Sequence, residues 1–182
     1  MLRRNLELKA CCGDLAYARD AALRLGAAPS AFERQRDTFY NSREGRLKLR
    51  EIERWPGLIG THGPATRHAE LIWYDRPNHL DVRTSAYRLV AAPDPAGLHA
   101  ALTAACGVRG VVAKDRTILL WRGVRIHLDT IDGLGTFVEF EAVLGPDLDA
   151  ETAADLLGTL QQTLRIDEHD RIATAYADLL GL

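Results

Sequence analysis

Cysteine is scarce in this chain and is not arranged to hold a metal. The 182 residues contain three cysteines, Cys11, Cys12 and Cys106, and no C-x-x-C pair. Neighbouring residues of a strand point to opposite faces, so Cys11 and Cys12 are poorly placed to share one ion. We therefore expect neither a zinc site nor a disulfide framework, and we interpret the thiols as buried or half-buried groups in a reducing compartment.

Long apolar runs and a strong net charge are also missing. No uninterrupted apolar segment approaches the ~20 residues that a membrane-spanning helix needs. The first ten residues, MLRRNLELKA, become charged too early for a secretory signal, so we expect a cytoplasmic protein. The net charge of -2 argues against general binding to nucleic acid or to an anionic membrane.

The chain does have enough apolar sequence for one compact domain. It is 47% hydrophobic and 26% charged, and no repeat or linker divides it, so we expect a single domain over residues 1–182. Segments that alternate in polarity, joined as hairpins with few helices between them, are typical of an antiparallel α+β fold. We predict strands over residues 6–10, 34–40, 45–53, 69–76, 83–91, 111–121, 124–130 and 136–143, a Gly- and Pro-rich loop over 54–67, and helices over 14–25, 94–106, 149–164 and 170–180.

The predicted strands carry charged residues at every second position, and such residues share one face of a sheet. The simplest interpretation is a charged face in water. Several of these pairs are like-charged, however, as in Glu139 with Glu141 and Lys48 with Arg50, and a solvated face usually mixes its signs. If the sheet curls until its edges meet, this face becomes the wall of a wet lumen. The wall would then hold seven cations and four carboxylates: Lys9, Lys48, Arg50, Arg76, Lys114, Arg116, Arg125, Glu7, Asp129, Glu139 and Glu141.

Enclosed charge of this kind predicts a charged ligand, because each enclosed charge costs several kcal/mol unless it is paired, hydrated or ligated. Arginine and lysine bind phosphoryl oxygens, and clustered carboxylates hold Mg²⁺ or Mn²⁺. The inventory therefore favours a polyphosphate together with a divalent cation.

Five segments of the chain together resemble one known family. They are LELKA at residues 6–10, QRDTFYNSREGRLKLRE at 35–51, VAKDR at 112–116, RIHLDTIDGLGTFVEFEA at 125–142 and AYADLL at 175–180. Their order is similar to that of CYTH proteins, the triphosphate tunnel metalloenzymes, which include class IV adenylyl cyclases and thiamine triphosphatases. The segment at 125–142 resembles the class IV cyclase-like branch most. The resemblance implies a closed antiparallel eight-stranded β-barrel with helices packed outside.

The resemblance also implies a site. It gives Glu7, Lys9, Glu139 and Glu141 a catalytic role. The implied triphosphate-binding residues are Lys9, Lys48, Arg50, Arg76, Lys114, Arg116 and Arg125, and the implied ligands of Mg²⁺ or Mn²⁺ are Glu7, Asp129, Glu139 and Glu141. One position departs from the family: where its signature reads E-x-E-x-K, this chain has Asn5-Leu6-Glu7-Leu8-Lys9. Asparagine offers a carbonyl oxygen without a negative charge, so weaker metal binding, or binding without catalysis, is an alternative.

Three functions stay open at this point. The first is metal-dependent hydrolysis of inorganic triphosphate, ATP or thiamine triphosphate. The second is conversion of ATP to cyclic AMP and pyrophosphate by a class IV adenylyl cyclase, and the third is triphosphate or nucleotide binding without catalysis. In each case the expected partner is a small molecule that contains a triphosphate, rather than nucleic acid or a membrane, and a homodimer is compatible with the resemblance.

Overall fold

The computed structural model describes residues 3–58, 63–75 and 83–182. Within these residues the chain forms eight strands, four α-helices and a short 3₁₀ turn at Glu168–Asp170. The strands are β1 (Arg3–Cys11), β2 (Ala28–Tyr40), β3 (Arg46–Pro56), β4 (Thr66–Asp75), β5 (Arg83–Ala91), β6 (Val108–Trp121), β7 (Val124–Ile131) and β8 (Gly135–Val143). The helices are α1 (Leu15–Arg24), α2 (Pro95–Cys106), α3 (Ala150–Thr163) and α4 (Tyr176–Leu179).

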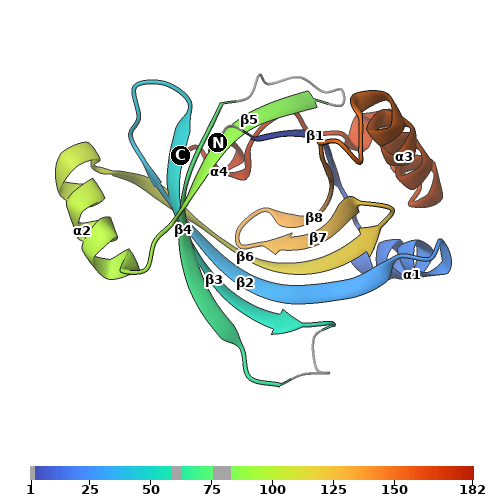
Figure 1. Ribbon diagram of the computed structural model, residues 1–182, viewed down its shortest axis with the longest axis horizontal. Coiled ribbons are helices and arrows are strands. Elements are labelled where there is room, and N and C mark those ends of the chain that lie inside the picture. Colours follow the sequence, from blue (N-terminus) through green and yellow to red (C-terminus); the bar gives the residue numbers. More distant parts are fainter. Residues whose placement is uncertain (1–2, 59–62, 76–82) are drawn as a thin grey trace.

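The strands form one antiparallel sheet that curls strongly around a central space (Figure 1). Their hydrogen-bonded order is β1-β5-β4-β3-β2-β6-β7-β8, and β1 pairs with both β5 and β8, so the hydrogen-bonded ladder is continuous around the sheet. The predicted α+β class and the eight antiparallel strands are confirmed. Among the described residues, no helix has the length and apolar character needed to cross a membrane.

The turn between β6 and β7 shows how local sequence sets the hairpins. Arg122 and Gly123 both have positive φ, 48° and 82°, which is the conformation of a type I′ turn. The twist of this turn matches that of the two flanking strands. The turn was predicted at these two residues, and its register then aligns Arg116 of β6 with Asp129 of β7.

Alternation along the strands separates an apolar outer face from a polar inner face. On the outer side, Leu8, Ile126 and Phe140 are fully buried against Leu157 and Leu160 of α3. Burying a side chain of this size contributes about 1.5–3 kcal/mol. The opposite side chains of the same strands must therefore face the interior of the curl, and there they are largely charged.

The extent of several elements was predicted wrongly, and the strand predicted over 34–40 begins at Ala28. The segment predicted as a loop over 54–67 is partly strand, because β3 continues to Pro56 and β4 begins at Thr66; residues 59–62 lie outside the described residues. The predicted helix over 170–180 is only the single turn of α4. The chain before it is held extended instead, since the Ile172 amide donates to the Lys9 carbonyl and Arg171 bridges to Ala10.

The C-terminal segment covers one end of the central space. Tyr176 and Ala177 belong to an apolar cluster with Phe39, Val112 and Phe137, and the ring centroids of Phe137 and Tyr176 lie 5.0 Å apart. Tyr176 is thereby fixed as part of the cavity wall at this end.

Candidate active site

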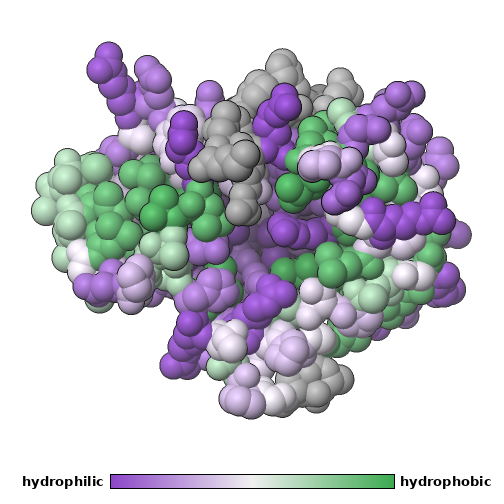
Figure 2. Space-filling model, in the orientation of Figure 1, coloured by the Kyte–Doolittle hydropathy of each residue, from purple (hydrophilic) through white to green (hydrophobic). Residues whose placement is uncertain are grey.

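The inner face of the sheet encloses a cavity of about 610 Å³ to which all eight strands contribute. The hollow at the centre of the face in Figure 2 is lined by hydrophilic residues. Of the residues predicted from the sequence, Arg76 lies outside the described residues, and Asp129 is fully buried and does not line the cavity. The cavity brings together the other nine: Glu7, Lys9, Lys48, Arg50, Lys114, Arg116, Arg125, Glu139 and Glu141.

On one wall, Asp37 of β2 holds two cations of β3. Its Oδ2 accepts a hydrogen bond from Lys48 Nζ at 2.7 Å, and Arg50 donates to both of its oxygens at 2.7 Å. Burial alone would raise the pKa of Asp37, but the charges of Arg50 and Lys48 outweigh it and hold that pKa well below its usual value. Burial and the neighbouring Arg50 in turn lower the pKa of Lys48 to about 8. Asp37 thus orients a pair of cations toward the cavity.

Asp129 holds a third cation in a comparable way. Arg116 Nε and Nη2 donate to its two oxygens at 2.6 Å each, and the Tyr176 hydroxyl donates to Oδ2 at 3.0 Å. The carboxylate is fully buried and does not line the cavity. Both oxygens of Asp129 are hydrogen-bonded by Arg116 and Tyr176, and its predicted role as a metal ligand stays a prediction. Its evident task is to fix the Arg116 guanidinium, which also donates to Glu139 at 3.0 Å.

Three carboxylates gather on β1 and β8. The register places Glu7 opposite Glu141, and Lys9 opposite Glu139. Burial would raise the pKa of Glu139, but the charges of Lys9 and Arg116 hold it well below its usual value. Burial would also raise the pKa of Glu141, but this pKa is lowered, chiefly by the neighbouring His127. Glu139 and Glu141 are therefore ionised at neutral pH, and ionised carboxylate oxygens are the donors that Mg²⁺ and Mn²⁺ prefer. The carboxylates are thus the right kind of donor for a divalent cation, but their oxygens are engaged by protein groups: Arg116 donates to Glu139, and Asn5 and Arg125 donate to Glu141. Among the described residues, the group of three or more such donors that lie within 4.8 Å of one another is Asp167, His169 and Asp170.

Asn5 sits beside these carboxylates and leaves one acceptor unused. Its Nδ2 donates to Glu141 Oε1 at 2.8 Å. Its Oδ1 has no hydrogen-bond partner, although the side chain lines the cavity and the residue is only 4% exposed. A buried acceptor without a partner costs about 1–3 kcal/mol, so the unused oxygen of Asn5 is a local cost to the stability of this wall.

Two lysines of the cavity wall lie beside the ring of Tyr176. Lys9 Nζ lies 3.8 Å from the centroid of the Tyr176 ring, and Lys114 Nζ lies 5.4 Å from the same centroid. Burial and the neighbouring Arg116 and Arg50 hold the pKa of Lys114 well below its usual value. An anionic ligand would reverse this shift, because it supplies the negative charge that the ammonium group needs.

The sequence reasoning missed part of the β2 wall. Glu33, Gln35 and Asp37 all point into the cavity, and Glu33 accepts hydrogen bonds from Gln35 Nε2 and Arg54 Nη1. The sequence did carry a signal, because these three residues alternate with the exposed Arg34 and Arg36. The strand predicted over 34–40 did not include Glu33, and Gln35 and Asp37 were not among the predicted site residues.

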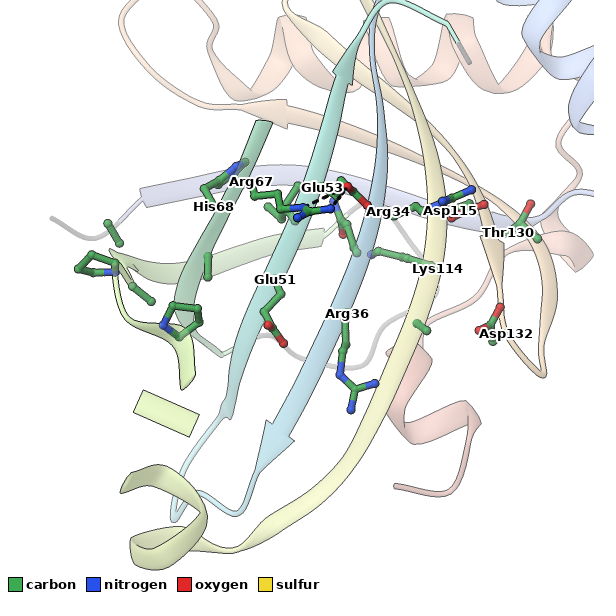
Figure 3. A pocket seen from close by; sticks show the side chains of 18 residues that line it. Arg34, Arg36, Glu51, Glu53, Arg67, His68, Lys114, Asp115, Thr130 and Asp132 are labelled. Carbon is green, nitrogen blue, oxygen red and sulfur yellow. Dashed lines mark hydrogen bonds and ion pairs between the residues drawn. The ribbon is translucent and has the colours of Figure 1, made fainter. Parts of the chain in front are cut away.

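A second cavity, of about 840 Å³, lies on the outer face of the sheet beside the start of α2 (Figure 3). Its lining holds four cations and four carboxylates. Arg67 Nη2 lies 2.7 Å from Glu53 Oε1, and Arg34 Nε lies 3.6 Å from Asp115 Oδ1. The arginines of these two pairs are largely exposed, unlike the buried cations of the inner wall.

The inner cavity thus combines oriented cations and ionised carboxylates, and the curled antiparallel sheet of an α+β fold surrounds them. A family model of the CYTH domain matches residues 3–176, and the chain belongs to the CYTH domain family. The family prediction is confirmed.

Several solved structures share this fold. The chain is similar to the PH1012 protein from Pyrococcus horikoshii, with 18% identity, a TM-score of 0.74, and coverage of 96% of this chain and 98% of that one. A candidate adenylate cyclase from Vibrio parahaemolyticus is 19% identical with a TM-score of 0.72 over 98% of both chains. A candidate adenylyl cyclase from Hippeastrum, described as having a dominant triphosphatase activity, is 12% identical with a TM-score of 0.62 over 98% of this chain and 93% of that one. No curated protein matches the chain.

Proposed function

We propose that the protein is a divalent-metal-dependent enzyme that hydrolyses a triphosphate substrate, and that the curled sheet works as a closed triphosphate tunnel. The observation that carries this proposal is that oriented cations and ionised carboxylates line one cavity. The cations of β3 and β6 and the carboxylates of β1 and β8 all contribute to its wall. Membership of the CYTH family and the triphosphatase activity described for the Hippeastrum protein support it.

The triphosphate is held by the cations that Asp37 and Asp129 orient. Arg50 and Arg116 present planar guanidinium groups, which bind phosphoryl oxygens through two parallel hydrogen bonds. Lys48 contributes a further charge, and a bound phosphoryl group raises its pKa again. The cations are fixed before the substrate arrives, so little of the binding free energy is lost in ordering them.

Glu7, Glu139 and Glu141 would hold the divalent cation. A divalent cation bound there supplies Lewis-acid neutralisation of the phosphoryl oxygens. In hydrolysis, a water oxygen forms a bond to the terminal phosphorus while the bond from that phosphorus to the bridging oxygen breaks. The leaving chain carries away the electron pair and the cations of the wall neutralise the developing charge, as in other phosphoryl transfers.

A second candidate within the same site is cyclisation of ATP. The Vibrio relative is a candidate adenylate cyclase, and the same wall can hold ATP with its α-phosphorus open to attack. The ribose 3′-hydroxyl would then be the nucleophile, and pyrophosphate would leave. The two reactions differ in the position of the nucleophile rather than in the phosphate-binding residues.

A third candidate, binding without turnover, is favoured by Asn5. This residue places an amide beside Glu141 where the family signature has a carboxylate. The site therefore has one negative charge fewer with which to attract a divalent cation. Substituting Asn5→Glu distinguishes the cases, because a protein that only binds should gain activity when the charge is added.

The test is to measure release of phosphate, pyrophosphate and cyclic AMP from inorganic triphosphate and ATP, with Mg²⁺ or Mn²⁺. The Glu139→Gln/Glu141→Gln double variant is the control for the metal site. We expect phosphate release that the control lacks. Cyclic AMP with pyrophosphate would instead identify a cyclase. Tight binding without any product, and activity only after Asn5→Glu, would contradict the proposal and favour the binding protein.

A further inference from the structure

One aromatic ring supports two lysines of the inner cavity. Lys9 Nζ of β1 lies 3.8 Å from the centroid of the Tyr176 ring, and Lys114 Nζ of β6 lies 5.4 Å from it. An ammonium group within about 6 Å of such a centroid is attracted to the face of the ring. The ring itself carries no charge. It therefore holds the two ammonium groups without neutralising them, whereas the Asp37 carboxylate both holds and neutralises Lys48.

The hydroxyl of the same side chain acts on a third cation. It donates a hydrogen bond to Asp129 Oδ2 at 3.0 Å, and Arg116 donates to both oxygens of that carboxylate at 2.6 Å. Tyr176 and Arg116 line the cavity, and Asp129 does not. The hydroxyl thus helps to fix the carboxylate that orients the Arg116 guanidinium.

Tyr176 belongs to the C-terminal segment rather than to the sheet that carries the cations. Before it in the chain, the Ile172 amide donates to the Lys9 carbonyl of β1 at 2.9 Å. After it, Asp178 Oδ2 lies 2.6 Å from Arg46 Nη2 of β3. These contacts tie the segment to the sheet on both sides of Tyr176 in the sequence. One side chain of this segment therefore reaches cations of two strands, β1 and β6.

We propose that Tyr176 is a positioning residue of the triphosphate site. Its ring supports Lys9 and Lys114 for contact with phosphoryl oxygens, and its hydroxyl acts on Arg116 through Asp129. Lysine has a flexible four-carbon stem, so a fixed ring beneath the ammonium group reduces the ordering that binding would otherwise require. This inference rests on the proposed function, because it takes the cations of the cavity to be those that bind the phosphates.

The experiment separates the ring from the hydroxyl. Tyr176→Phe removes the hydroxyl alone, and Tyr176→Leu removes the ring as well. Tyr40 offers matched controls, because it is 2% exposed, its hydroxyl is hydrogen-bonded to His99 at 2.8 Å, and it does not line the cavity. Tyr40→Phe and Tyr40→Leu therefore report the loss of stability alone. Dissociation constants for inorganic triphosphate are measured by calorimetry without added divalent metal, at a temperature at which thermal melts show each variant to be folded.

We expect Tyr176→Phe to raise the dissociation constant by about two- to fivefold, because Arg116 still binds Asp129 without the hydroxyl. Tyr176→Leu should raise it by about tenfold or more, because both lysines lose their support. The two Tyr40 variants should melt at lower temperature than the unmodified protein and yet change the dissociation constant by less than about twofold.

A double-mutant cycle tests the route from the hydroxyl to Arg116. Lysine at position 116 cannot form the paired hydrogen bonds to Asp129, so the hydroxyl no longer has a guanidinium to orient. In the Arg116→Lys background, Tyr176→Phe should therefore change the dissociation constant by less than about twofold. A loss of stability alone would not produce this dependence on the background.

Three results would overturn the positioning role and leave the proposed function standing. The first is a folded Tyr176→Leu variant that binds triphosphate as tightly as the unmodified protein. The second is an equal loss of affinity in the Tyr176 and Tyr40 variants, which would trace the effect to stability. The third, which also decides the matter if Tyr176→Leu does not fold, is an equal effect of Tyr176→Phe with and without Arg116→Lys. If the unmodified protein does not bind triphosphate, the proposed function fails and the positioning role fails with it.

Discussion

Replacing Asp37 with asparagine tests whether the cations of β3 are positioned for an anion. In the folded protein the Asp37 carboxylate is the shared partner of Lys48 and Arg50. Asparagine keeps the shape of the side chain but removes its charge. Lys48 and Arg50 would then lie side by side on β3 without the carboxylate of β2 that now binds both of them.

The expected loss of stability is large because the three side chains are mostly buried. The exposed fractions are 4% for the Asp37 side chain, 11% for Lys48 and 16% for Arg50. Removing one partner of a buried ion pair costs about 3–5 kcal/mol, and partial hydration in the cavity favours the lower figure. For a chain of this size each kcal/mol lowers Tm by about 2–4 °C, so Asp37→Asn should melt about 6–12 °C below the unmodified protein.

A bound triphosphate should compensate for the lost carboxylate, because its oxygens can accept hydrogen bonds from Lys48 and Arg50. Thermal melts with and without inorganic triphosphate should therefore show a larger stabilisation by the ligand in Asp37→Asn than in the unmodified protein. Asp115→Asn is the matched control, since Asp115 lies 3.6 Å from Arg34 and both side chains are about half exposed. An exposed pair contributes about 0–1 kcal/mol, so this control should melt close to the unmodified protein.

Two results would refute the reasoning about Asp37. One is an Asp37→Asn variant that melts within a degree or two of Asp115→Asn, since the buried cations would then not depend on their carboxylate. The other is equal stabilisation of the variant and the unmodified protein by triphosphate, which would mean that the ligand binds away from Lys48 and Arg50.

Three further changes probe other parts of the wall. Since burial lowers the pKa of Lys48 to about 8, its charge is lost as the pH rises through that value; the affinity for triphosphate should fall between pH 7 and 9, and a flat profile identical to that of Lys48→Arg would contradict this. Tyr176→Phe removes a buried hydrogen bond to Asp129 and should lower the free energy of unfolding, measured in urea, by about 1.5–3 kcal/mol. An unchanged midpoint of unfolding would show that this hydrogen bond contributes nothing. Arg116→Lys cannot form the paired bonds to Asp129, so the dissociation constant for triphosphate should rise about tenfold or more, and an unchanged constant would remove Arg116 from the site.

Much of the site was predictable because a strand has a period of two. Like-charged pairs such as Lys48 with Arg50 and Glu139 with Glu141 fall on one face whatever the exact strand ends are. The curl of the sheet then brings the faces of different strands together. This is why nine residues chosen from the sequence line one cavity, even though several strands are longer than predicted.

The pairing within the site was not predictable, because it depends on register between strands. Asp129 alternates with the other charged residues, and nothing in the sequence shows that Arg116 faces it across β6 and β7. The register brings both of its oxygens to Arg116, and Asp129 itself does not line the cavity. The extended chain before Tyr176 was missed for a similar reason: it is held by contacts with β1, which lies more than 160 residues earlier in the chain.

The most direct test of the central claim is a crystal structure with inorganic triphosphate and Mn²⁺, using anomalous diffraction to locate the metal. We expect an anomalous peak ligated by Glu7, Glu139 and Glu141, with the phosphate chain against Arg50 and Arg116. An ordered triphosphate in the outer cavity beside Arg34 and Arg67, or a manganese peak elsewhere while the inner carboxylates remain bound only to protein groups, would contradict the account.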